Sequence, residues 1–150
     1  IETLRRYTNY AGKSATKTLL AKLIYLADFA WYYEHLQPMS GMKYRRLQYG
    51  PVPDQYFRII DELINEGKIS LEVGNEAQWL NLTRSAQDVP SQYLSVSELE
   101  LIDKIAKKWK NSNTKEIVHF THTQLPWQIC REQEYIPYEL ITQEEPDRVY

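Results

Sequence analysis

The chain has few of the residues that build disulfide scaffolds and phosphate-binding loops: it contains one cysteine and five glycines among 150 residues. The single Cys130 excludes an internal disulfide and is typical of a protein from a reducing compartment. No apolar run approaches the roughly 20 residues that cross a bilayer, and no basic and then apolar leader opens the chain. We therefore expect a soluble cytoplasmic protein with no membrane partner.

Motifs of catalysis and metal binding are missing as well. There is no G-x-S-x-G elbow, no Gly-rich phosphate loop and no H-E-x-x-H helix. His119 and His122 are spaced i, i+3 and Cys130 follows them, but a fourth zinc ligand is lacking and the spacing fits no standard zinc finger. The interpretation is a protein that is not an enzyme, with no catalytic residue, no metal site and no cofactor.

Aromatic residues, in contrast, are abundant, with twelve tyrosines and four tryptophans. Their rings either fill a helical core or occupy partly exposed positions, where an apolar body with a polar tip suits an interface. The composition of 43% hydrophobic and 25% charged residues is that of a globular protein. A chain of this length fits a single domain over residues 1–150.

The longest helical pattern covers residues 18–36 and is apolar around most of its circumference. Such a helix is expected at the centre of the fold, mostly buried. Its remaining side carries a semi-polar line of Tyr25, Asp28, Tyr32 and His35. Further helices are expected over residues 54–66, from a capping box at Ser97 and Glu100 to Trp109, and from Asn113 with Glu116 to His122.

Alternation of apolar and polar residues predicts a β-hairpin that starts at Ile69 and turns at Gly74-Asn75. Residues 85–91, with Pro90, are expected to form a loop, and the acidic tail 137–150 is expected to pack loosely. The predicted fold class is α+β: a mostly helical single domain with a central buried helix and a small antiparallel β-hairpin.

Residues 49–53 read Tyr-Gly-Pro-Val-Pro, a segment in which two prolines flank a valine. Proline has a fixed φ, lacks an N–H and pushes the preceding residue toward extended geometry. We expect a stiff, kinked connector here, with Pro53 beginning the next helix and residues 43–49 forming a short strand before it. A rigid loop serves recognition as well as it serves as a joint, and the local chemistry leaves both readings open.

Three motifs in this order resemble a known family: KLIYLADF at residues 22–29, YGPVP at residues 49–53 and THTQLPW at residues 121–127. Together they resemble the Panacea domain of SocA-like and phage-associated antitoxins, over about residues 18–127. The resemblance implies a protein that binds and neutralises a toxin encoded beside it, and one branch of the family delivers its toxin to a bacterial protease. It also implies a structural role for the motif residues, which are Asp28, Gly50, Pro51, Val52, Pro53, His122, Pro126 and Trp127.

Asp28 is an acid on an apolar helix, so it must be hydrogen-bonded or exposed. One reading is that it accepts hydrogen bonds from a neighbouring loop or tyrosine and fixes the packing. A sharper hypothesis is a bond to the backbone N–H of Gly50 or Val52, which would join the helix and the proline loop. His122 is expected to cap or brace the turn at Pro126 and Trp127.

DNA binding is an alternative, because helix, strand, helix and hairpin in residues 18–82 loosely mimic a winged helix. The helix that would enter the groove, residues 54–66, carries four acids against one basic residue, Arg58. Such a surface repels phosphate, and Lys43, Arg45 and Arg46 make only a small basic footprint. We therefore do not expect a nucleic-acid partner.

The expected partner is a cognate protein toxin, which the protein would neutralise by direct stoichiometric contact. An adaptor that hands the toxin to a cytoplasmic protease is the alternative, and a winged-helix-like DNA-binding regulator is the more distant one. The candidate contact residues lie near the proline loop and include tyrosines and arginines, residue types enriched among interface hot spots. They are Tyr32, Tyr44, Arg45, Arg46 and Tyr49.

Overall fold

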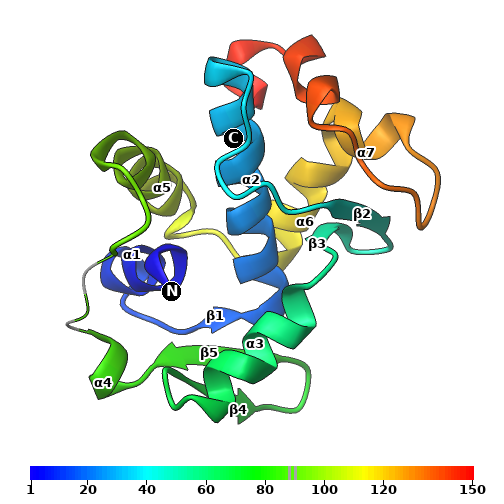
Figure 1. Cartoon of the computed structure of the whole chain (residues 1–150). Helices are drawn as coiled ribbons and strands as arrows, with labels where there is room; N and C mark the ends of the chain where they lie inside the picture. Colours follow the sequence, from blue (N-terminus) through cyan, green and yellow to red (C-terminus); the bar gives the residue numbers. More distant parts are fainter. Residues whose placement is uncertain (88, 90) are drawn as a thin grey trace.

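The computed structural model describes every residue of the chain except 88 and 90. Helix α2, Lys17–His35, runs through its centre, with α1 and α5 on one side and α6 and the β2–β3 hairpin on the other (Figure 1). The Thr16 hydroxyl oxygen caps α2 by accepting a hydrogen bond from the Leu19 N–H at 3.1 Å. Buried leucines, alanines and aromatic residues lie around most of α2, so the predicted central buried helix is confirmed.

A small antiparallel sheet packs at the N-terminal end of α2 (Figure 1). Its strands are β1 (Ala15–Thr16), β5 (Gln78–Leu82) and β4 (Ile69–Val73), in that order across the sheet. The β4–β5 hairpin is the predicted one, and α3, Tyr56–Asn65, packs against β4. The two-residue strand β1 was not predicted, because two residues are too few to show an alternating pattern.

The proline segment is a strand of a second hairpin, which corrects the expectation of a kinked connector. β2, Tyr44–Leu47, pairs antiparallel with β3, Gly50–Pro53. β3 lies at the edge of this two-stranded sheet, where the missing N–H groups of its prolines leave no pairing partner unsatisfied. Pro53 does not begin the next helix, since α3 starts at Tyr56.

The remaining helices are α1 (Glu2–Ala11), α4 (Arg84–Gln87), α5 (Val96–Trp109), α6 (Thr114–Thr123) and α7 (Leu125–Ile129). The cap of α6 at Asn113 and Glu116 is the predicted one. The cap of α5 is Ser95 with Glu98 rather than Ser97 with Glu100; both serines have a glutamate three positions later, so the motif alone does not choose between them. Part of the expected loop 85–91 is helical in α4, and Pro90 lies outside the described residues.

The C-terminal segment packs onto the domain, against the expectation of a loose tail. It forms two 3-10 turns, η1 (Tyr138–Gln143) and η2 (Pro146–Arg148), of which η1 contacts α2 (Figure 1). Ile141 and Val149 are 0% and 2% exposed. The Gln124 side-chain amide donates to the carbonyl oxygens of Arg148 and Val149 at 2.8 and 3.0 Å. The burial of these two apolar side chains and the hydrogen bonds from Gln124 stabilise the packed segment in spite of its acidic composition.

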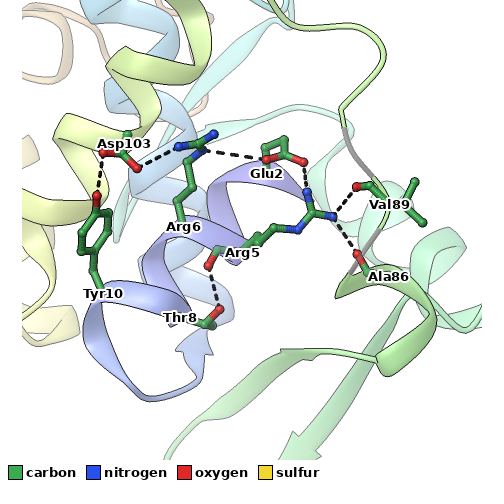
Figure 2. A network of polar contacts seen from close by, with 8 residues as sticks. All are labelled: Glu2, Arg5, Arg6, Thr8, Tyr10, Ala86, Val89 and Asp103. Atoms are coloured by element: carbon green, nitrogen blue, oxygen red, sulfur yellow. Dashed lines mark hydrogen bonds and ion pairs between the residues drawn. The ribbon is translucent and has the colours of Figure 1, made fainter. Parts of the chain in front are cut away.

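A polar network connects α1 to α5, to α4 and to Val89 beyond α4 (Figure 2). The Arg6 guanidinium and the Tyr10 hydroxyl donate to Asp103 at 2.8 and 2.7 Å. Arg5 is paired with Glu2 and donates to the Ala86 carbonyl oxygen at 2.7 Å. Two guanidinium groups therefore face two carboxylates, and this network holds α1 in place without leaving a free charge. Among the described residues, no helix is long and apolar enough to cross a membrane.

Candidate protein-binding surface

Asp28 organises a buried junction between α2, the loop before β2 and the C-terminal segment. Its carboxylate accepts hydrogen bonds from the Ser40 N–H, the Tyr44 hydroxyl and the Tyr138 hydroxyl, each at 2.9 Å, and from the Ser40 hydroxyl. Burial, and then the charge of Asp28, raises the pKa of Tyr44 well above its ordinary value, so this hydroxyl keeps the proton that it donates. Asp28 thus accepts hydrogen bonds from a neighbouring loop and from tyrosines, as one interpretation of the sequence expected, and its carboxylate pairs with these groups rather than with the N–H of Gly50 or Val52.

Tyr44, one of the candidate contact residues, is buried in this junction. Tyr44 is 0% exposed, with its ring among Tyr25, Phe29 and Tyr138. A side chain without accessible surface cannot touch a partner, so Tyr44 belongs to the core. The reason is its place in β2: its side chain points toward α2, where Asp28 accepts its hydroxyl proton.

The proline hairpin is joined to α2 by Lys22 instead. The Lys22 ammonium donates a hydrogen bond to the Pro51 carbonyl oxygen at 2.8 Å, and Lys22 is 0% exposed. The sequence reasoning passed over this residue, although a lysine among leucines on a helix apolar all round was the available signal. The hairpin and α2 therefore form one unit, through a contact different from the predicted one.

Gly50 is the point of closest approach between β3 and the helices. Its φ is +99°, and a Cβ there would lie 2.8 Å from both Lys22 Cε and the Thr121 hydroxyl oxygen. We expect Gly50→Ala to lower the free energy of unfolding by about 2–4 kcal/mol, from backbone strain and from overpacking together. Urea denaturation checks this, with Gly41→Ala as the control: its φ is +69° but nothing lies within 4 Å of its Cβ position, so it reports strain alone. Equal losses in the two variants would contradict the packing argument.

Trp127 lies between two basic side chains. The Arg46 guanidinium carbon lies 3.7 Å from the centre of the indole, and the His122 ring stacks on the indole at 4.0 Å with an interplanar angle of 17°. A parallel ring at this distance covers one face, so Arg46 occupies the other. Arg46 also donates to the Trp127 carbonyl oxygen at 2.9 Å, and Trp127 donates to the Leu47 carbonyl oxygen at 3.2 Å. The His122 ring therefore lies against Trp127, at the turn that it was expected to cap or brace.

The charge of Arg45 is neutralised within the fold. Its guanidinium donates to Asp54 at 2.6 Å and to the Tyr135 hydroxyl at 2.6 Å. The hydrogen bond from Arg45 is the first cause that holds the pKa of Asp54 below its ordinary value. Arg45 is half-buried, so it borders the surface without offering a free charge.

Lys22, Arg46 and His122 form a group that we call the basic cluster. Within the described part of the chain, neither Lys22 nor Arg46 has a carboxylate within ion-pair distance. Burial lowers the pKa of Lys22 to about 7. Burial first, and then the positive charges of Lys22 and Arg46, also lower the pKa of His122. Burial in the basic cluster therefore disfavours the charged forms of Lys22 and His122.

Two exposed aromatic rings stand beside this cluster. Tyr49, in the turn between β2 and β3, is 62% exposed, and Phe57, on the first turn of α3, is 55% exposed. With Leu47, Val52 and Lys22 they line a pocket of about 100 Å³. We call Arg46, Tyr49 and Phe57, together with this pocket, the hairpin surface. Phe57 was missed because the helical pattern of residues 54–66 does not show that its exposed side faces the hairpin.

Tyr32 lies apart from the hairpin surface. It is ten residues beyond Lys22 on α2, about 15 Å along the helix axis. Its ring stacks on Tyr138 of the C-terminal segment, with centroids 5.4 Å apart. Tyr32 is half-buried and stays a separate candidate position.

The residues that the structure describes contain no group of three or more His, Cys, Asp or Glu side chains placed to hold a metal ion such as zinc.

A family model described as antitoxin SocA-like, Panacea domain, matches residues 20–128. The chain belongs to this family. The matched Panacea region runs from α2 to α7 and includes Lys22, Asp28, the proline hairpin and the Trp127 stack. No significant match was found among curated proteins or solved structures. Membership in a Panacea-domain family indicates an antitoxin-like, non-enzymatic role.

Proposed function

We propose that the protein neutralises a cognate protein toxin by direct stoichiometric contact, and that the hairpin surface makes this contact. The observation that carries the proposal is the exposure of Tyr49 and Phe57 around one pocket, with Arg46 on the same hairpin as Tyr49 and, among the described residues, without a carboxylate at ion-pair distance. Tyrosine and arginine are enriched among interface hot spots, and depletion of acids is typical of an interface core. All three residues lie inside the region that the Panacea family model matches.

The anchoring of the hairpin also supports this role. The side chains of Lys22 and Trp127 donate hydrogen bonds to the carbonyl oxygens of Pro51 and Leu47. Backbone hydrogen bonds join Arg46 of β2 to Gln133 and Glu134. A surface that is already ordered loses little conformational freedom on binding, which favours affinity. We infer that neutralisation proceeds by occlusion: a rigid surface covers the part of the toxin that does the damage.

The test is a pair of truncations, Tyr49→Ala and Phe57→Ala, in the antitoxin purified with the product of the adjacent gene. Each should weaken binding by about 1–3 kcal/mol, as expected for exposed aromatic anchors that become buried in a complex. Tyr93→Ala is the matched control, because Tyr93 is 94% exposed and lies before α5, outside the hairpin surface. Calorimetry measures the affinities, and rescue of growth during co-expression measures neutralisation.

Affinities of the Tyr49 and Phe57 variants equal to that of the Tyr93 variant would contradict the assignment of the surface. An adaptor would give a different result: added protease would make the bound toxin disappear, whereas an occluder protects it. A DNA-binding regulator would lose affinity steeply as salt rises. We do not expect that behaviour, because the exposed side of α3 presents Asp61, Glu62 and Glu66 against Arg58.

A further inference from the structure

Lys22 is a buried amine that has no carboxylate at ion-pair distance among the described residues. It has no accessible surface, and among the described residues the recorded partner of its ammonium is a single neutral acceptor, the Pro51 carbonyl oxygen at 2.8 Å. An ammonium group has three donors, so two remain available. A buried charge without an opposite charge destabilises the fold, and such groups concentrate at functional sites. The hydrogen bond to Pro51 explains where Lys22 points, but it does not explain why a cation is there.

The pocket over Lys22 indicates which kind of group its size and walls suit. Its volume of about 100 Å³ is well below the roughly 300–1,000 Å³ of small-molecule sites, so it suits the end of one side chain. Its walls are mostly apolar, formed by Ala21, Leu47, Val52 and Tyr56, with Tyr49 and Phe57 exposed at the mouth. Methylene groups fit such walls. Besides Lys22, the charged side chain that lines the pocket is Lys17, so no acid in the lining opposes an anion.

We propose that this pocket receives an aspartate or glutamate side chain of the toxin, whose carboxylate pairs with the free donors of Lys22. This inference rests on the proposed function and names the chemistry that its surface recognises. The methylene groups of the acidic residue pack between Tyr49 and Phe57. Because Lys22 is sealed in the free protein, entry must displace part of the pocket wall, and Tyr49, at 62% exposure, is the most exposed lining residue.

The first experiment needs no toxin and uses propionate, which reproduces the end of an acidic side chain. In the full chain, the NMR signals of the Lys22 ε-methylene group, assigned by their absence in Lys22→Met, are followed at constant ionic strength. Propionate should shift these signals saturably and raise the pKa of Lys22, while the neutral propionamide should not. Identical, non-saturating drift with the two compounds would overturn the proposal.

The second experiment uses the product of the adjacent gene. Lys22→Met keeps the apolar stem and removes the charge, and it should weaken toxin binding on the order of 30-fold or more, as for loss of one partner of a buried pair. Lys13→Met, at an exposed site, is the control and should leave affinity unchanged. One Asp→Asn or Glu→Gln change in the toxin should cause a loss that does not add to that of Lys22→Met.

The outcomes separate the two proposals. Unchanged affinity of Lys22→Met for the toxin would overturn the carboxylate pocket and leave the antitoxin function standing. A wild-type protein that does not bind the adjacent gene product would overturn the proposed function, and the propionate titration would still decide whether the pocket accepts a carboxylate.

Discussion

Asp28→Ala should lower the free energy of unfolding by about 2–4 kcal/mol, because it leaves the buried Tyr44 hydroxyl and the Ser40 N–H without their acceptor at about 1–3 kcal/mol each. The Tyr138 hydroxyl keeps a second acceptor, the Met42 carbonyl oxygen at 2.6 Å. Asp28 is 2% exposed and accepts from Ser40, Tyr44 and Tyr138. These donors belong to the loop before β2, to β2 itself and to η1. The change therefore loosens two regions around α2 that are far apart in the sequence, residues 40–44 and η1.

Urea denaturation followed by tryptophan fluorescence measures this loss. Asp61→Ala on the exposed side of α3 is the matched control and should change stability by less than about 0.5 kcal/mol. Asp28→Asn keeps the size of the side chain and one acceptor oxygen, so it should fall between the two. A loss from Asp28→Ala no larger than that from Asp61→Ala would show that the junction does not stabilise the fold.

Lys22→Met should raise stability at pH 6 and lower it at pH 10. Lys22 has a pKa of about 7 in the folded chain against 10.5 ordinarily. Below pH 7 both states carry the charge, and its burial costs the folded state about 4–5 kcal/mol, at about 1.4 kcal/mol for each pH unit between the two pKa values. Between pH 7 and 10.5 the unfolded state alone holds this proton, so the free energy of unfolding rises with pH.

Methionine removes both the penalty and the pH dependence, but it leaves the Pro51 carbonyl oxygen without its donor, which costs about 1–3 kcal/mol. The variant should therefore be more stable than the wild type by about 1–4 kcal/mol at pH 6 and less stable by up to about 2 kcal/mol at pH 10. Comparing the two proteins at each pH cancels the titration of most other groups, and His122→Gln serves as the control for the neighbouring histidine. A difference that keeps one sign from pH 6 to pH 10 would contradict the burial of an uncompensated charge.

The spacing of apolar residues and the capping motifs in the sequence predicted the central helix, the β4–β5 hairpin and the start of α6. The apolar residues of 18–36 lie on all sides of one helix, so their burial at the centre follows whatever else is present. The alternation around Gly74 predicted the β4–β5 hairpin, and Asn113 with Glu116 predicted the start of α6. The three motifs in their order were sufficient to predict the family, which the family model over residues 20–128 shows.

Position within the tertiary structure decided the roles of individual side chains. Tyr44 and Tyr49 are both tyrosines of the proline hairpin, yet one is 0% and the other 62% exposed, because one faces α2 from the strand and the other stands in the turn. The acidic tail packs because Ile141 and Val149 find apolar neighbours and Gln124 binds the backbone beside them.

The hydrogen bonds of Asp28 and Lys22, which connect α2 to the segments around it, were likewise predictable only in part. The sequence indicates that Asp28 and Lys22 need partners, since charges on an apolar helix cannot be buried alone. It does not indicate which ones, because the partners are a tyrosine 110 residues away for Asp28 and a proline carbonyl oxygen 29 residues away for Lys22. Contacts between residues so far apart are set by how the helices and hairpins pack, and only the folded structure determines that packing.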